Sequence, residues 1–298
     1  MQKAERFMQG RESWFPCGDH HMRYLNLPAE NGPGLWWWFT RRRPAVVFVH
    51  GLMGYSFSWR HNLEFFAKHR DMYAVDLLGI GHSDRPQPAS ADFGLEAAAG
   101  RLLEFMRGLR HSEIDVVATS HGAAVAMLAA SQDYCCGRPL IRRLALVAPA
   151  HPFMPSENLN QVVASTSLGR MLVASCGGMV QGQAMGYLYA DESRITEETH
   201  AGYAVNFQDE SSYDYALEVT GSWREDMQKL EAALPSIAGI RTLLIWGEDD
   251  QTIPASTAPG LRQCFREVEL ETLPGVGHLP YEEAPVDFNR CLLEYLER

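Results

Sequence analysis

Ser120 lies in the stretch VVATSHGAA, where an apolar run gives way to residues rich in alanine. A strand that turns sharply into a helix lifts a serine hydroxyl above a sheet, commonly within the pattern G-x-S-x-G. The turn requires small side chains two positions before and after the serine, and Ala118 and Gly122 meet that requirement. A match this short arises by chance, so Ser120 is a candidate nucleophile only if the chain supplies a base and an acid.

The C-terminal part of the chain offers both partners. A serine hydroxyl is a poor nucleophile until a base takes its proton and a third group orients that base. His278 stands in PGVGHLPYEEAP, a glycine-rich loop between a predicted strand and the last helix, which Glu282 and Glu283 begin. The preceding loop, LLIWGEDDQTIP, contains three candidate acids: Glu248, Asp249 and Asp250. The order serine, acid, histidine predicts a triad at the C-terminal ends of parallel strands.

An oxyanion hole needs two backbone N–H groups beside the nucleophile. We expect one from His121, directly after Ser120, and one from Leu52 in the stretch VHGLMG. The imidazole of His121 has three interpretations: a competing base, a contact to substrate, or a packed side chain. Packing or substrate contact is the preferred one. His50 is interpreted as a brace for the loop that carries Leu52.

Alternating strand and helix patterns predict the elements that position these residues. Continuous apolar runs are typical of strands buried on both faces of a parallel sheet. They are separated by helical spacing at 56–68, 95–109 and 121–131, with further helices near 256–265 and 283–297. The strand runs are AVVFVHG, MYAVDLLG, IDVVAT, RRLALVAP, RTLLIWG and EVELETLPG. This order predicts an α/β fold with a doubly wound, mostly parallel sheet.

Residues 151–235 break the alternation and show helical spacing around 159–174, 195–207 and 223–234. We interpret them as a helical cap, or lid, inserted into one core domain formed by residues 1–150 and 236–298. The insertion is rich in methionine and aromatic residues, which favours an apolar substrate over a sugar or a nucleotide.

Residues 20–43 are predicted to form a two-stranded ribbon, with HHMRYLNLP as one strand and LWWWFTRRR as the other. The run Trp36, Trp37 and Trp38 could indicate a stacking or sugar-binding surface. Because side chains of a strand alternate between faces, we interpret the run as half core and half surface.

Composition narrows the class of protein. The 298 residues carry a net charge of −11, which argues against nucleic acid or an anionic membrane surface as partner. Six cysteines without a C-x-x-C pair predict neither a zinc site nor a disulfide framework, and no histidine and carboxylate spacing indicates a metal. The sequence shows no signal peptide and no apolar run long enough to cross a membrane. We therefore expect a cytoplasmic protein without membrane insertion.

Taken together, these motifs resemble the α/β-hydrolase family, specifically a serine hydrolase with a helical cap. The matching stretches are VFVHGLMGYSFSWR, DLLGIGHSDRP, ATSHGAA, LLIWGEDDQTIP and GVGHLPYEEAP, in the family's order over nearly the whole chain. In the family's G-x-x-D pattern the fourth residue is the triad acid, which implies Asp250, with Asp249 as the next choice. Dehalogenases and epoxide hydrolases of this fold place an aspartate at the nucleophile position. Ser120 therefore implies attack on a carbonyl carbon.

The resemblance implies a cofactor-free serine hydrolase in which Ser120 attacks, His278 shuttles the proton and Asp250 orients His278. The expected substrate is a small, apolar carboxylic ester that forms an acyl-enzyme. The alternatives are a carbon–carbon bond hydrolase acting on a vinylogous diketone of the meta-cleavage type, an acyltransferase, an amidase, and a small-molecule receptor on the same fold with little turnover. Substrate-binding residues and assembly into a homo-oligomer are left open.

Overall fold

The strands form one mixed sheet in a computed structural model, which describes residues 8–30, 43–155, 171 and 180–298. Eight strands lie in the order β1-β2-β4-β3-β5-β6-β7-β8. All neighbouring pairs from β4 to β8 are parallel, whereas β1–β2 and β2–β4 are antiparallel. The strands are β1 Glu12–Cys17, β2 His20–Leu27, β3 Ala45–Val49, β4 Met72–Val75, β5 Ile114–Thr119, β6 Ile141–Val147, β7 Arg241–Gly247 and β8 Val268–Leu273.

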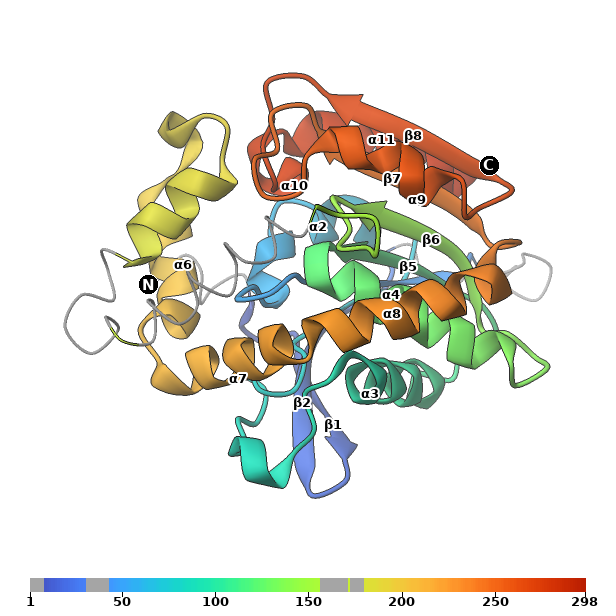
Figure 1. Ribbon diagram of the computed structural model, residues 1–298, viewed down its shortest axis with the longest axis horizontal. Helices are drawn as coiled ribbons and strands as arrows, with labels where there is room; N and C mark the ends of the chain where they lie inside the picture. The colour runs from blue at the N-terminus through green and yellow to red at the C-terminus, as the bar shows by residue number, and fades with distance from the viewer. Residues whose placement is uncertain (1–7, 31–42, 156–170, 172–179) are drawn as a thin grey trace.

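Helices cover both faces of the sheet (Figure 1). The helices of the described residues are α2 Leu63–Ala67, α3 Leu95–Gly108, α4 Ser120–Tyr134, α6 Glu197–Phe207, α7 Glu210–Gly221, α8 Trp223–Ala233, α9 Ala258–Arg262, α10 Pro280–Glu283 and α11 Pro285–Glu297. Short 3-10 turns are η1 Ser56–Trp59, η2 Pro88–Ser90, η3 Glu192–Arg194, η4 Leu234–Ile237 and η5 Ala255–Thr257. The predicted helix over 56–68 is instead η1 followed by the short α2.

Two hydrophobic clusters, one on each face, hold the helices to the sheet. Successive residues of a strand point to opposite faces. Accordingly Val47 and Val49 of β3 join the cluster that contains α3, α4 and α8, whereas Val46 and Phe48 join the one that contains α2 and α11. This explains why β3 is buried at every position and reads as a continuous apolar run. The predicted doubly wound, mostly parallel sheet is confirmed.

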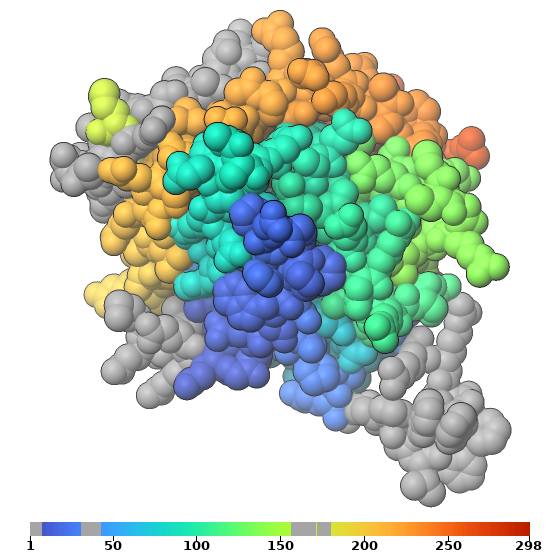
Figure 2. Space-filling model, turned by 90° about the horizontal axis from the view of Figure 1, so that it is seen from below, coloured from blue at the N-terminus to red at the C-terminus, as the bar shows by residue number. Residues whose placement is uncertain are grey.

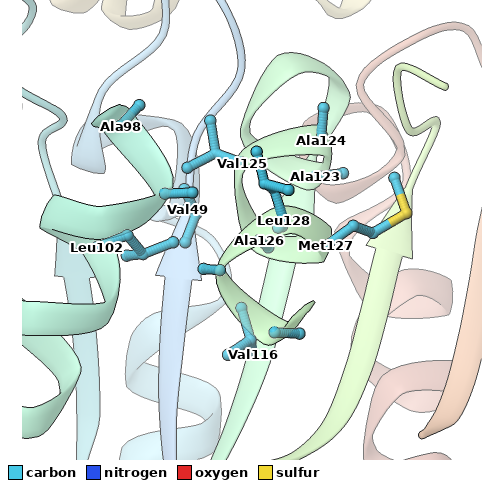
Figure 3. Close-up of a cluster of buried hydrophobic side chains, with 14 of the residues drawn as sticks. Val49, Ala98, Leu102, Val116, Ala123, Ala124, Val125, Ala126, Met127 and Leu128 are labelled. Atoms are coloured by element: carbon cyan, nitrogen blue, oxygen red, sulfur yellow. The ribbon is translucent and has the colours of Figure 1, made fainter. Parts of the chain in front are cut away.

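Helix α4 is the most deeply buried helix of the first cluster. Its alanine-rich sequence places small side chains against the sheet and against α3. Figure 3 shows Val125 and Leu128 of α4 near Val49 of β3 and Leu102 of α3. Helix α4 is apolar on nearly every side and is buried on nearly every side, which is typical of a central helix. The helix that begins at Ser120 is therefore a rigid base for that residue.

The N-terminal edge of the sheet is a hairpin of β1 and β2, and β2 also pairs with β4. The second strand of the predicted ribbon, with Trp36, Trp37 and Trp38, falls in residues 31–42, which lie outside those described. Gly18, with φ of 62°, occupies the tight turn between β1 and β2. Strand β1 escaped prediction because Pro16 interrupts its pattern, yet proline is tolerated on an edge strand. Figure 2 shows the hairpin in dark blue on one face, and Phe15 packs on Phe105 of α3 at 5.6 Å between ring centroids.

Between β6 and β7 the described residues contain helices and no strand. Residues 180–188 are helical, and α6 and α8 match two of the three predicted stretches. Most of the third stretch, 159–174, lies outside the described residues. Helix α7 was not predicted. Figure 1 places α6 and residues 180–188 at one end of the molecule, whereas α8 runs back across α4.

Candidate active site

Ser120 sits at the turn from β5 into α4, with φ of 51°. Left-handed backbone is costly for a residue with a Cβ and is a known mark of functional turns. The preceding Thr119 is extended, so the chain reverses direction within one residue. Ser120 is only half-buried, in contrast to its neighbours on either side. The predicted strand–turn–helix geometry is therefore present, and the serine side chain is accessible.

Gly122 allows this turn to approach the neighbouring strand. A Cβ at position 122 would lie 2.0 Å from the backbone oxygen of His50, far inside contact distance. Ala118 is fully buried on β5 between Val49 and Leu146 of the adjacent strands. The structure thus leaves no room for a side chain at Gly122, and Ala118 is enclosed by the two adjacent strands.

The loops after β7 and β8 bring an acid and a base together. His278 Nδ1 lies 2.8 Å from Asp250 Oδ2, and both side chains are almost fully buried. The other oxygen of Asp250 accepts hydrogen bonds from the backbone N–H groups of Thr252 and Ile253 at 2.8 and 2.9 Å. Glu248 and Asp249 are exposed. Of the three candidate acids, the structure therefore places Asp250 against the histidine.

Ser120 and His278 are not in direct hydrogen-bond contact. Within the part of the chain that the structure describes, Ser120 Oγ makes no hydrogen bond to His278. In sites without substrate this bond is often long and tightens when substrate binds. With Nδ1–H donated to Asp250, the Nε2 atom of His278 is the acceptor that a general base requires.

The loop of residues 50–54 borders Ser120. A Cβ built at Gly51 would lie 3.0 Å from Ser120 Cβ and 3.6 Å from its Oγ, so Leu52 follows a residue in contact with the serine. His50 braces this loop as expected. Its Nε2 accepts the N–H of Leu77 at 3.0 Å, so Nδ1 carries the proton and donates to the Gly51 carbonyl at 2.8 Å. Burial lowers the pKa of His50, which favours this neutral form.

Residues with a strained backbone lie together at the C-terminal edge of the sheet. Met53, Ser120 and Ala148 are three of the four described non-glycine residues with positive φ, at 59°, 51° and 40°. They follow β3, β5 and β6, whose C-terminal ends lie side by side. Ala150 N–H also donates to the Ser120 carbonyl at 3.0 Å. Strained residues cluster at sites where geometry is fixed for function.

The side chain of His121 is buried, and its ring lies against Trp223 of α8 at 6.2 Å between centroids. Burial, with a smaller effect from His50, lowers its pKa to about 3. Its Nδ1 has no hydrogen-bond partner among the described residues. These contacts favour the packing interpretation. The backbone N–H of His121 lies in the first turn of α4, directly after Ser120.

Two buried carboxylates near His278 lie in a different helix from the one predicted. Glu282 and Glu283 belong to the short α10, not to the start of the last helix. Glu283 accepts the N–H groups of Gly277 and Ala190, at 2.7 and 3.0 Å. Leu188 O in turn accepts the N–H of His278 at 2.8 Å. The loop that carries His278 is thereby attached to residues 188–190, a contact that no local sequence pattern indicates.

Glu282 makes the second connection of this kind. It accepts hydrogen bonds from Tyr189, Arg60 and Tyr203, and the Arg60 guanidinium forms an ion pair with it at 2.8 Å. All four side chains are buried. These bonds therefore link Arg60, which directly follows η1, and two residues of the segment between β6 and β7 to α10.

No group of three or more histidine, cysteine or acidic residues able to hold a metal occurs within residues 8–30, 43–155 and 180–298. Across the same ranges, no helix is long and apolar enough to span a bilayer. The described cysteines, Cys17, Cys135, Cys136, Cys264 and Cys291, are free thiols.

Comparison with known proteins identifies the family. A family model described as "Alpha/beta hydrolase family" matches residues 46–290. The chain belongs to the alpha/beta hydrolase family. The mostly parallel sheet flanked by helices described above is the fold of that family.

Relatives within the family have different activities. The chain is 24% identical to 2-hydroxy-6-oxo-2,4-heptadienoate hydrolase of Pseudomonas putida over 84% of this chain and 88% of that protein. It is 22% identical to epoxide hydrolase 3 of Xenopus tropicalis over 86% of this chain and 72% of that one. Among solved structures, a putative lipase of Acinetobacter baumannii superposes with a TM-score of 0.80 at 19% identity, covering 99% of this chain and 94% of that one. At such identities the hydrolase fold is shared, but the substrate is not indicated.

Proposed function

We propose that this alpha/beta hydrolase is a serine hydrolase that cleaves a small, apolar carboxylic ester. The observation that carries the proposal is the combination of a serine at a strained strand–helix turn with a buried Asp250–His278 pair at the ends of neighbouring strands. In this mechanism His278 Nε2 takes the proton of Ser120 as its Oγ attacks the carbonyl carbon. Asp250 holds Nδ1–H and stabilises the imidazolium that forms.

The tetrahedral intermediate carries a negative oxygen, which the N–H groups of Leu52 and His121 are proposed to bind. His278 then protonates the leaving alcohol, and an acyl-enzyme remains on Ser120. Water, activated by the same histidine, attacks the acyl carbon and releases the acid and the free serine. The side chains of the chain itself supply each proton transfer, and no cofactor is needed.

The serine argues against the epoxide hydrolase activity of one relative. Attack by an aspartate on an epoxide gives an ester, which water cleaves at the carbonyl carbon. Attack by Ser120 would give an ether, which offers water no carbonyl carbon, so turnover would stop. A carbonyl substrate is therefore favoured.

A second candidate is hydrolysis of a carbon–carbon bond in a vinylogous diketone. The observation in its favour is the similarity to 2-hydroxy-6-oxo-2,4-heptadienoate hydrolase, which covers most of both chains. The same serine, histidine and aspartate would attack the ketone carbonyl, and a carbanion rather than an alcohol would leave.

We further propose that residues 151–235 act as a cap over this site and line it with apolar side chains. In support, Tyr189, Tyr203 and Phe207 are buried against the core, and Leu188 contacts the His278 loop. A substrate held there would be largely apolar, with its carbonyl directed at Ser120.

The test is a substrate series. Wild type and Ser120→Ala are assayed with p-nitrophenyl esters of two to twelve carbons and with a 2-hydroxy-6-oxo-dienoate. Ester turnover that the substitution abolishes would support the proposal. Turnover of the dienoate alone would select the second candidate, and turnover of neither class would exclude both.

A further inference from the structure

Asn206 lies near the end of α6 and is completely buried, although it belongs to the segment between β6 and β7. It makes four hydrogen bonds. Its Oδ1 accepts from the backbone N–H of Gly81 at 3.0 Å and from Arg85 Nη2 at 3.1 Å. Its Nδ2 donates to the backbone oxygens of Met53 at 3.1 Å and Gly54 at 3.3 Å. The amide is thus inserted between two loops of the core.

The orientation of this amide follows from its partners. A backbone N–H and a guanidinium only donate, and two carbonyl oxygens only accept, so oxygen and nitrogen cannot be exchanged without losing every bond. The two donors and two acceptor positions of an asparagine are all used. A buried polar group satisfied to this degree fixes the position of its neighbours.

One of those neighbours is the loop that borders Ser120. Residues 50–54 include Leu52, and Met53 has a left-handed backbone with φ of 59°. His50 holds the loop at its start through the Gly51 carbonyl. Asn206 holds its end through the carbonyls of Met53 and Gly54. The Leu52 N–H shares its peptide group with the Gly51 carbonyl, which also accepts the N–H of Gly54 at 3.0 Å. Since that N–H shares its peptide group with the Met53 carbonyl, the peptide held by Asn206 is bonded to the one that carries the Leu52 N–H.

The position of Asn206 is itself well fixed. Gly202, one turn earlier on α6, has no room for a Cβ because Phe57 would lie 2.0 Å away, so the helix lies directly on η1. Arg85 also donates to the carbonyls of Gly81 and Val205 and pairs with Asp209 at 2.6 Å. A shift of α6 would therefore move the amide and the loop together.

We propose that Asn206 is a positioning residue that sets the Leu52 N–H for oxyanion binding and so couples the position of α6 to catalysis. This inference rests on the proposed serine hydrolase function. Asn206 touches no reacting atom and acts through the backbone of Met53 and Gly54. Its contribution is realised only when the carbonyl oxygen of the substrate becomes negative.

The test uses Asn206→Asp, which keeps the size of the side chain and its acceptor contacts to Gly81 and Arg85. It replaces the amide donor by a carboxylate oxygen that faces two carbonyls. The matched control is Tyr213→Phe, which removes a buried hydrogen bond to the Phe207 carbonyl at 3.2 Å in the same region without touching the loop. Both are compared with wild type on the best p-nitrophenyl ester and with a trifluoromethyl ketone, whose hemiketal oxygen imitates the oxyanion.

We expect kcat of Asn206→Asp to fall about 10- to 100-fold, less than the loss typical of removing an oxyanion donor outright. KM should change less than about threefold, and the trifluoromethyl ketone should bind more weakly by a factor similar to the loss in kcat. Tyr213→Phe should keep both values. Unchanged kcat and inhibitor affinity in a folded Asn206→Asp would overturn the inference, as would equal losses in the control.

Asn206→Ser, which introduces no charge, is measured by the same criteria if Asn206→Asp does not fold. The two levels of failure are distinct. An active wild type with unaffected Asn206 variants overturns this inference alone. A wild type that neither hydrolyses esters nor binds the ketone overturns the proposed function and the inference with it.

Discussion

At the scale of single residues, the decisive feature is which of three neighbouring carboxylates faces His278. The residue types alone do not distinguish Glu248, Asp249 and Asp250, and only the resemblance to the family's G-x-x-D pattern indicates Asp250. Burial and a 2.8 Å hydrogen bond distinguish it in the structure, because the turn after β7 directs its side chain inward. Adjacent residues of one loop point in different directions, which composition does not reveal.

Asp250→Asn is therefore expected to lower kcat by about 10⁴-fold, because an amide in place of the carboxylate disfavours the tautomer that leaves Nε2 free. Asp249→Asn is the matched control and should stay within about twofold of wild type. The measurement is steady-state ester hydrolysis with circular dichroism to confirm folding. A larger loss in the Asp249 variant would show that the acid has been assigned to the wrong residue.

At the scale of elements, long-range contacts of short segments position the catalytic loop. Strand ends, and with them the places of Ser120, Asp250 and His278, follow from apolar runs and turn residues. The attachment of the His278 loop by Glu283 does not, because its partners Gly277 and Ala190 are brought together only by the fold. The sequence therefore predicts which residues reach the sheet edge but not what holds them there.

We expect Glu283→Gln to reduce the free energy of unfolding by about 1–3 kcal/mol, because an amide nitrogen would face the N–H group of Gly277 or of Ala190. Ester turnover should fall as well, since the loop of His278 loses a fixed attachment. The exposed Glu294, replaced by glutamine in the same way, is the control and should change neither quantity. Chemical denaturation and kinetics on both variants provide the comparison. Wild-type stability and kcat in Glu283→Gln would show that the loop is held by other contacts.

At the scale of the whole molecule, the two-sided sheet was predictable and its N-terminal edge was not. A strand buried on both faces leaves a continuous apolar run, so β3 to β7 stand out in the sequence. Edge strand β1 alternates, contains Pro16 and buries little, so its pattern is weak. The same two-sided burial encloses His50, His121 and His151 in the interior.

Acid sensitivity follows from these buried imidazoles. Burial lowers the pKa of His151 from its usual 6.5 to about 4. Its Nδ1 accepts the Phe153 N–H, and its Nε2 bonds Thr257. A lowered folded-state pKa means that the unfolded chain binds protons first as pH falls. The contribution of His151 to the free energy of unfolding is therefore fully present above pH 6.5 and is lost as pH falls toward 4. At pH 5 the loss from this one residue is about 2 kcal/mol.

The check is urea denaturation at pH 7 and pH 5 for wild type and His151→Gln. The drop in the free energy of unfolding between the two pH values should be about 2 kcal/mol smaller in the variant, whatever its stability at pH 7. An identical drop in both proteins would mean that His151 does not titrate between the folded and unfolded states.

The central claim is that Ser120 is an activated nucleophile, and covalent labelling tests it most directly. Wild type, Ser120→Ala and the control Ser236→Ala are treated with a fluorophosphonate, and the adduct is located by peptide mass spectrometry. The account predicts one phosphonyl group on Ser120 in wild type and in the control, and none in Ser120→Ala. An unlabelled wild type, or a label on another residue that persists in Ser120→Ala, would contradict it.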